Sequence, residues 1–136
     1  MAGYSQKSLE KKLGLSSGQV VRLVNVPGHY QSLFTEFPSD LTFEDGPAIK
    51  KQFIHAFVEN AEALHTLLPA LKRELADKGM IWISWPKKSS GISTDIREND
   101  IRNLALSIGL VDVKVCAVDD TWSGLKLVIP LKDRKG

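Results

Sequence analysis

Continuous and largely β-branched apolar runs recur along the chain, and each of them predicts a β-strand. Most of the runs are apolar at successive positions, which is typical of strands covered on both faces of a parallel sheet. The last two runs are joined by a link short enough for an antiparallel hairpin. The predicted strands lie at residues 19–26, 41–43, 52–58, 80–85, 111–118 and 125–131.

Between these runs, apolar residues recur at helical spacing and predict two main helices. In the first helix we expect a kink or break at Pro69 and a C-terminal stop at Gly79. Residues 97–108 predict the second helix, which Thr94 or Asp95 can cap. The N-cap and apolar stripe of the first helix are Asn60, Leu64, Leu67, Leu68, Leu71 and Leu75.

Two shorter helical segments are predicted nearer the N-terminus. Residues 5–13 can form a helix that Ser5 caps and Gly14 ends. Residues 30–37 predict one or two helical turns, which Pro38 closes.

Strands and helices therefore alternate until the final hairpin. This order predicts an α/β three-layer sandwich with a mostly parallel sheet and a C-terminal antiparallel hairpin. We expect a single domain over residues 1–136, with a helical arm at residues 1–18 and a C-terminal tail at residues 132–136.

Composition and charge narrow the classes of function. The 136 residues carry a net charge of +2, which does not favour nucleic-acid binding. No apolar run is long enough to span a bilayer, and the first residues lack the apolar stretch of a signal peptide, so no membrane association is expected. The single cysteine, Cys116, excludes an internal disulfide and indicates a reducing, cytoplasmic location.

Polar residues follow the ends of several predicted strands. The carboxyl ends of parallel strands meet at one edge of a sheet, where ligands commonly bind, so we expect a ligand site at this edge. The alternative is that these residues simply mark where the chain re-enters water. The candidate binding residues are Asn25, His29, Glu59, Lys87, Lys88, Ser89, Ser90, Asp119, Asp120 and Trp122.

The loop after the strand at residues 80–85 holds the clearest ligand chemistry. Lys87 and Lys88 can hold a phosphate or carboxylate, with further donors from the two serines that follow and from the backbone of Gly91. The spacing is not that of a Walker P-loop, so nucleotide hydrolysis is not supported. A solvated loop with two ordinary lysines is the competing interpretation.

The aromatic and titratable residues indicate structure more than catalysis. Trp82 and Trp85 are three positions apart on a strand and therefore point to opposite faces, as expected for a two-sided core. Trp122 lies in the predicted hairpin turn, either as a lid on the core or as a stacking face. His55 is expected in the core and Cys116 as an inert thiol in a strand. We identify no catalytic residue and no metal-ligand set.

The C-terminal part of the chain resembles the C-terminal half of a Rossmann-like methyltransferase. Its order is a helix, the segment Ala-Asp-Lys-Gly-Met-Ile-Trp-Ile at residues 76–83, a loop and a second helix, and a closing antiparallel hairpin. The resemblance implies a Rossmann-like sheet and S-adenosylmethionine as ligand. Such enzymes have a glycine-rich turn after the first strand and an acidic residue after the second. Residues 24–30 lack the glycine pattern, and Glu44 and Asp45 match only loosely, so the cofactor is left unknown.

A closer resemblance rests on two long motifs. Residues 82–88 read Trp-Ile-Ser-Trp-Pro-Lys-Lys, and residues 109–126 read Gly-Leu-Val-Asp-Val-Lys-Val-Cys-Ala-Val-Asp-Asp-Thr-Trp-Ser-Gly-Leu-Lys. Together with Gly-Tyr-Ser at residues 3–5, they resemble a bacterial family of small proteins known only as a domain of unknown function. This resemblance spans nearly the whole chain and implies no activity.

These observations leave three hypotheses of different kinds. The first is a non-catalytic binding or regulatory module whose strand-end edge takes a small anionic ligand or a protein partner. The alternative is a minimal or degenerate S-adenosylmethionine-dependent, methyltransferase-like enzyme. The third is a protein that acts by assembly, pairing its short edge strand near Leu41 with a second copy. The sequence does not predict the oligomeric state.

Overall fold

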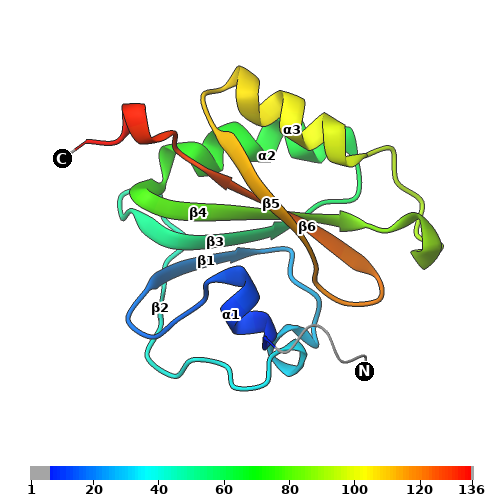
Figure 1. The fold of residues 1–136 in the computed structure, drawn as a ribbon, viewed down its shortest axis with the longest axis horizontal. Coiled ribbons are helices and arrows are strands. Elements are labelled where there is room, and N and C mark those ends of the chain that lie inside the picture. Colours follow the sequence, from blue (N-terminus) through cyan, green and yellow to red (C-terminus); the bar gives the residue numbers. More distant parts are fainter. Residues whose placement is uncertain (1–6, 136) are drawn as a thin grey trace.

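The computed structural model describes residues 7–135, and its strands form one six-stranded sheet (Figure 1). The strands are β1 (Val20–Val24), β2 (Thr42–Phe43), β3 (Lys51–Phe57), β4 (Leu75–Pro86), β5 (Val111–Ala117) and β6 (Trp122–Val128). The helices are α1 (Leu9–Leu13), α2 (Ala61–Arg73) and α3 (Glu98–Ser107), with short 3-10 turns η1 (Tyr30–Leu33), η2 (Lys88–Ser90) and η3 (Leu131–Asp133).

The sheet order is β2-β1-β3-β4-β6-β5. Pairing is parallel from β2 through β4 and antiparallel between β4 and β6 and between β6 and β5. Each predicted strand is present, and the mostly parallel sheet with a C-terminal antiparallel hairpin is confirmed. The last strand begins at Trp122, three residues earlier than the apolar run indicates.

The helices are divided between the two faces of the sheet (Figure 1). Helices α2 and α3 cover one face, called here the helix face, and α1 and η1 cover the other, called the α1 face. Successive side chains of a strand point to opposite faces, so each central strand contributes to both cores. In β3, Ile54 packs under α2 and α3 while Phe53 packs toward α1. Trp85 and Trp82 divide in the same way, so the predicted two-sided core is confirmed.

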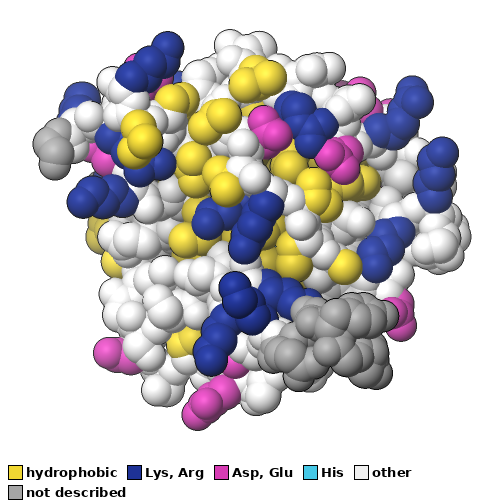
Figure 2. Space-filling view, viewed as in Figure 1, with side chains coloured by type: hydrophobic (Ala, Val, Ile, Leu, Met, Phe, Trp, Pro, Cys, Tyr) yellow, Lys and Arg dark blue, Asp and Glu magenta, His cyan; other side chains and the backbone are white. Residues whose placement is uncertain are grey.

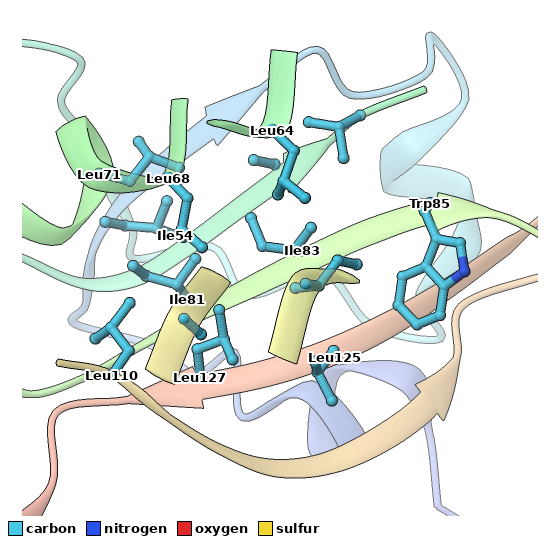
Figure 3. Close-up of a cluster of buried hydrophobic side chains, with 14 of the residues drawn as sticks. Ile54, Leu64, Leu68, Leu71, Ile81, Ile83, Trp85, Leu110, Leu125 and Leu127 are labelled. Atoms are coloured by element: carbon cyan, nitrogen blue, oxygen red, sulfur yellow. The ribbon is translucent and has the colours of Figure 1, made fainter. Parts of the chain in front are cut away.

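The core on the helix face is the larger of the two, and Figure 3 shows its central side chains. Leu64, Leu68 and Leu71 of α2 point down onto Ile54 and Ile81 of the central strands. All five side chains are completely buried. This packing fixes α2 over β3 and β4 and thereby positions the carboxyl end of β4, where the candidate site lies.

Helix α2 differs from its prediction at two points. It runs unbroken through Pro69, because Leu64, Leu68 and Leu71 anchor the turns on both sides of it in the core. It ends at Arg73 instead of Gly79, and Leu75 belongs to β4 instead of the helical stripe. No helix within residues 7–135 is long and apolar enough to cross a membrane.

Gly79 lies inside β4, where the absence of a side chain allows β3 and β4 to approach closely. Lys51 pairs with Leu75 and Phe53 pairs with Met80, so four residues of β4 stand opposite one residue of β3. A Cβ at Gly79 would lie only 2.7 Å from the carbonyl oxygen of Lys51. The glycine is thus needed at this bulge, not as the stop of a helix.

The N-terminal prediction is confirmed in part. Helix α1 begins at Leu9 and ends at Leu13, and the Gly14 that follows has the left-handed φ of 83° expected of a C-terminal glycine. The proposed cap Ser5 lies outside the described residues. The predicted turns near residue 30 are a single 3-10 turn, η1.

A buried ion cluster closes the edge of the sheet at which β3 and β4 begin. The Glu74 carboxylate lies 2.8 Å from Lys51 Nζ and 2.5 Å from Arg22 Nη1. Lys51 is completely buried and also donates to the carbonyl oxygen of Gly46. Burial alone would raise the pKa of Glu74, but the hydrogen bonds from Lys51 and Arg22 hold it below its ordinary value.

Candidate functional site

A pocket of about 670 Å³ opens at the carboxyl end of β4, on the helix face. Trp85 and Ile96 provide apolar surface in it, and both side chains also belong to the core below. The rest of the lining comes from the strand exit, the loop before α3 and the facing strand β6: Pro86, Lys87, Lys88, Thr94, Asp95, Arg97, Glu98 and Ser123. We call this the β4 pocket.

The loop that leaves β4 is held in shape by its own hydrogen bonds. The Lys87 amide donates to the carbonyl oxygen of Thr121 at 2.8 Å, which ties the loop to the hairpin. The Ser90 hydroxyl donates to the Lys87 carbonyl at 2.7 Å and accepts from the Ile92 amide at 3.1 Å. Ser90 therefore shapes the loop, whereas Ser89 is exposed. Gly91 has a φ of 80°, which permits the return of the chain.

The opposite wall of the β4 pocket is fixed to both helices. Asp95 Oδ1 accepts a hydrogen bond of 2.7 Å from the Ala61 amide, so Asp95 satisfies the start of α2 and not that of α3. The Thr94 hydroxyl accepts from the Ile96 amide within its own loop. The predicted capping of the following helix by Thr94 or Asp95 is thus wrong. Arg97 occupies the N-cap position, and its amide donates to Asp100 Oδ2.

Positive charge predominates at the β4 pocket. Lys87, Lys88 and Arg97 line it, and none of the three forms an ion pair with another residue in the 7–135 range. The carboxylates nearby are engaged, because Asp95 accepts from α2 and Glu98 pairs with Arg102. Three cations above an apolar floor are suited to the charged group of an anionic ligand.

Three of the remaining candidate residues line a second hollow at the same edge. Asn25 and Glu59 line a pocket of about 460 Å³ at the ends of β1 and β3, together with Phe57 and Trp122. We call this the switch-point pocket, because the strand order reverses between β1 and β3. The sequence treats the ten candidates as one set, but Lys87 and Lys88 line the β4 pocket whereas Asn25, Glu59 and Trp122 line the switch-point pocket. The other five candidates, His29, Ser89, Ser90, Asp119 and Asp120, are not among the lining residues of either pocket.

The hairpin acids have different surroundings. Asp119 Oδ2 lies 3.5 Å from His29 Nε2, which brings together the ends of β1 and β5. The other oxygen of Asp119 accepts hydrogen bonds from the amides of Thr121 and Trp122, each at 2.8 Å, so this side chain builds the turn. Asp120 is exposed in the same turn.

Trp122 is the first residue of β6, whereas the sequence predicts it in the hairpin turn. Its ring meets Phe57 edge to face at a centroid distance of 4.9 Å, and the residue is 8% exposed. It therefore acts as the lid on the core of the α1 face, which was one of its two predicted roles.

A buried network beneath this edge was not visible in the sequence. His55 Nδ1 lies 2.8 Å from the Tyr30 hydroxyl, and His55 Nε2 lies 2.8 Å from the Ser84 hydroxyl. His55 and Ser84 are completely buried, and burial lowers the pKa of His55 to about 3. The neutral ring donates from one nitrogen and accepts at the other, which satisfies both hydroxyl groups. Its burial keeps this network from contact with a substrate.

Thiol chemistry and metal binding are two further possibilities on which the structure bears. Burial raises the pKa of the Cys116 thiol, and Lys12, Lys114 and Lys87 oppose that effect. Within the described part of the chain, no group of three or more His, Cys, Asp or Glu side chains is arranged to hold a metal ion.

The fold is similar to solved structures of methyltransferases. A protein assigned to the type 11 methyltransferases, from Sulfolobus solfataricus, matches with a TM-score of 0.60 and 16% identity, over 94% of this chain and 93% of that one. A ribosomal-protein methylase from Lactobacillus delbrueckii subsp. bulgaricus matches with a TM-score of 0.57 and 13% identity, over 94% and 75%. Magnesium protoporphyrin IX methyltransferase from Synechocystis PCC 6803 matches with a TM-score of 0.59 and 11% identity, over 90% and 78%. At these identities the likeness establishes a Rossmann-like, methyltransferase-like fold.

The residues at the switch-point pocket do not fit S-adenosylmethionine in the manner of that fold. Strand β1 leads into Asn25, which has a φ of 57°, then Pro27 and the 3-10 turn η1, where a glycine-rich turn would open a helix. Strand β2 has only two residues, and Glu44 after it lies in a different pocket, with Arg22 and Phe43. The backbone donors and the acidic partner that would hold the ligand are therefore not assembled.

The family assignment rests on the sequence itself. No curated protein matches the chain. The family model described as "Protein of unknown function (DUF3052)" matches residues 30–131, which include both long motifs. The chain therefore belongs to the DUF3052 family of proteins of unknown function.

Proposed function

We propose that this protein is a non-catalytic binding module that takes a small anionic ligand in the β4 pocket. The observation that carries the proposal is the set of three cations, Lys87, Lys88 and Arg97, which surround a pocket of about 670 Å³ and have no ion-pair partner within residues 7–135. The neighbouring carboxylates are engaged by other groups, so the positive charge is left for a ligand.

The shape of the site supports this proposal as well. The loop is tied to the hairpin through the Lys87 amide and to α2 through Asp95, so little ordering is needed when a ligand binds. Trp85 and Ile96 add apolar surface beside the cations. This combination suits a phosphate or carboxylate that is attached to an apolar or planar body.

Thermal unfolding in the presence of phosphorylated and carboxylated metabolites tests the proposal. A ligand present at one hundred times its dissociation constant stabilises a protein by about 2.7 kcal/mol, which is readily detected. The first probes are inorganic phosphate, pyrophosphate, nucleoside monophosphates and citrate. A compound that raises the melting temperature of the wild type should lose its effect in Lys88→Ala/Arg97→Ala and keep it in Lys78→Ala.

The matched control, Lys78, is an exposed lysine in the amino-terminal half of β4 and does not line the β4 pocket. Equal stabilisation of the double variant and the wild type would assign the ligand to another surface. If no compound stabilises the wild type, the β4 pocket is not an anion site and the proposal fails.

A methyltransferase-like enzyme is the second candidate, favoured by the fold and by the switch-point pocket between Asn25 and Glu59. Titration calorimetry with S-adenosylmethionine and S-adenosylhomocysteine decides this case. Binding that is weakened by Asn25→Ala would support the enzyme, whereas absence of heat at high protein concentration would reject it. The poor fit at β1 leads us to expect no heat.

A further inference from the structure

Two lysines face each other across the C-terminal hairpin. Lys114 of β5 pairs directly with Lys126 of β6, so both side chains stand on the same face of the sheet. Like charges directly opposite one another destabilise an antiparallel pair. Neither lysine has an ion-pair partner among residues 7–135. Burial, and then the charge of Lys114, lower the pKa of Lys126.

The two lysines belong to a larger basic surface on the α1 face. Lys126 pairs with Trp82 of β4, whose indole packs on that face and donates to the Leu13 carbonyl. Lys12 and Lys87 lie close enough to act, with Lys114, on the Cys116 thiol. Figure 2 shows dark blue side chains gathered over the hairpin and α1. Lys87 borders this surface but lines the β4 pocket, so we call Lys12, Lys114 and Lys126 the lysine patch.

The lysine patch borders the outer strand of the sheet. Strand β5 is last in the strand order, so its outer edge has no neighbouring strand in the described part of the chain. Val115 pairs with Leu125, whose side chain packs on the helix face, so Val115 and Lys114 point to opposite faces. Val113 and Val115 are 51% and 48% exposed. The free edge therefore offers backbone groups, positive charge on one face and apolar surface on the other.

We propose that β5 binds an extended segment of a partner protein that adds to the sheet as a new strand and carries alternating acidic and apolar residues. In an added strand, successive side chains point to opposite faces. Acidic side chains would meet the lysine patch on the α1 face, and apolar side chains would cover Val115 on the other. The negative charge of the acidic side chains would offset the repulsion between Lys114 and Lys126, while backbone hydrogen bonds between the two strands would supply affinity.

The same features argue against a second copy of this chain as the occupant. An antiparallel pair of β5 edges, related by a two-fold axis through the sheet, places both α1 faces on the same side, which would set one lysine patch beside another. The irregularity between Asp112 and Lys114 also interrupts the regular strand, so that only residues 114–117 pair continuously with β6. A short edge of this kind suits a peptide segment better than a continuous sheet between two domains.

Fluorescence anisotropy with defined peptides tests the inference. The probe is a labelled peptide in which Glu and Val alternate, and its controls are a peptide with the same residues in two blocks and an alternating Lys–Val peptide. We expect binding of the Glu–Val peptide alone, weakening with salt and falling about tenfold in Lys114→Glu. Lys78→Glu makes the same charge change elsewhere on the sheet and should bind as the wild type does.

Hydrogen exchange then locates the contact. Amides of β5 should become protected in the complex, because a new strand covers their outer edge. Lys88→Ala/Arg97→Ala should leave peptide binding unchanged, which separates this inference from the anion site at the β4 pocket. Thermal unfolding of each variant establishes that it is folded.

Several outcomes would overturn the inference. They are equal binding of the block peptide, the same affinity in Lys114→Glu, protection that avoids β5, or no binding at millimolar peptide. Binding restricted to an oligothymidine or to phosphatidylserine vesicles would assign the lysine patch to nucleic acid or membrane instead.

Discussion

His55 occupies an aromatic environment in which a charged ring would be costly. Phe53, Phe57 and Tyr30 surround it, with the Phe57 ring stacked at a centroid distance of 4.5 Å. Its two nitrogens are satisfied by hydroxyl groups of distant segments. The residue therefore connects η1, β3 and β4 as a neutral ring, and protonation would leave a buried charge without a carboxylate partner.

The free energy of unfolding should consequently depend on pH through His55. Its pKa is about 3 in the folded protein and near 6.5 in the unfolded chain, so between these values the unfolded state binds more protons. Stability contributed by the neutral ring is present above about pH 6.5 and is lost as the pH falls. Between pH 7 and pH 5 the loss is about 2 kcal/mol.

Urea unfolding of the wild type and His55→Gln at several pH values checks this prediction. Glutamine retains hydrogen-bonding groups but does not titrate, so the difference between the two slopes isolates His55. Parallel pH profiles of the two proteins would show that the histidine is not kept neutral by burial.

For single residues, the sequence indicates on which face of the sheet a side chain lies, but not which side chains it contacts. Alternation along a strand is enough to predict that Trp82 and Trp85 enter different cores, and the structure agrees. The network of His55 joins residues 30, 55 and 84, and its geometry depends on the register between β3 and β4. Local pattern contains no information on that register.

The junction between α2 and β4 illustrates how elements compete for the same residues. Leu75 continues the helical spacing of Leu68 and Leu71, so the sequence extends the helix to the next glycine. Tertiary pairing prevails, because Leu75 instead joins β3 opposite Lys51, and the intervening residues form a bulge. Helix propensity cannot reveal this outcome, since the pairing partner lies more than twenty residues earlier.

Gly79→Ala should destabilise the protein by about 1–3 kcal/mol. The added Cβ would meet the Lys51 carbonyl oxygen at 2.7 Å and a methyl carbon of Leu75 at 2.9 Å. Because the Lys51 carbonyl oxygen is a backbone atom, this clash can be relieved only if β3 and β4 move apart. Chemical denaturation measures the change.

Gly46→Ala is the matched control for this substitution. A Cβ at Gly46 meets no atom within 4 Å, so its unfolding midpoint should remain close to that of the wild type. If the two variants were equally stable, the close approach at the β3–β4 bulge would be refuted.

In the C-terminal hairpin, by contrast, a substitution is expected to stabilise the protein. Lys114→Gln removes the like-charge pair with Lys126 and should raise the free energy of unfolding by about 0.5 kcal/mol. The gain should shrink at high salt, since dissolved ions screen the charges of the exposed Lys114 and the partly exposed Lys126. Urea unfolding at low and high salt measures it, with Lys78→Gln as the control that should not change stability. A destabilised Lys114→Gln would mean that the lysines do not repel each other.

On the scale of the whole molecule, the two ends of the parallel strands differ in character. The amino end is closed by the Glu74 carboxylate, which pairs with both Lys51 and Arg22. The carboxyl end opens into the β4 pocket, where Lys87, Lys88 and Arg97 form no ion pair with any other residue that the structure describes. This contrast agrees with our proposal that the carboxyl edge takes a ligand, as is common in open α/β sheets.

The position of the site could be predicted only in part. The rule that ligands bind at the carboxyl ends of parallel strands directs attention to the lysine loop, and in the structure this loop lines a pocket. The sequence does not indicate Arg97, although it starts a predicted helix, because the return of the loop onto β4 depends on Gly91 and on the Asp95 contact with α2. It also does not separate the β4 pocket from the switch-point pocket, since both follow the same rule.

The division between the two edges leads to a prediction with two independent readouts. Glu74→Gln leaves Lys51 buried without its carboxylate and should destabilise the protein by about 3 kcal/mol. It should leave the affinity of an anionic ligand at the β4 pocket unchanged. Lys88→Ala/Arg97→Ala should do the reverse, with an unfolding midpoint near that of the wild type and a loss of ligand binding. Urea unfolding and calorimetry on both variants decide the matter, because a variant that changed both quantities would show that the two edges are energetically coupled.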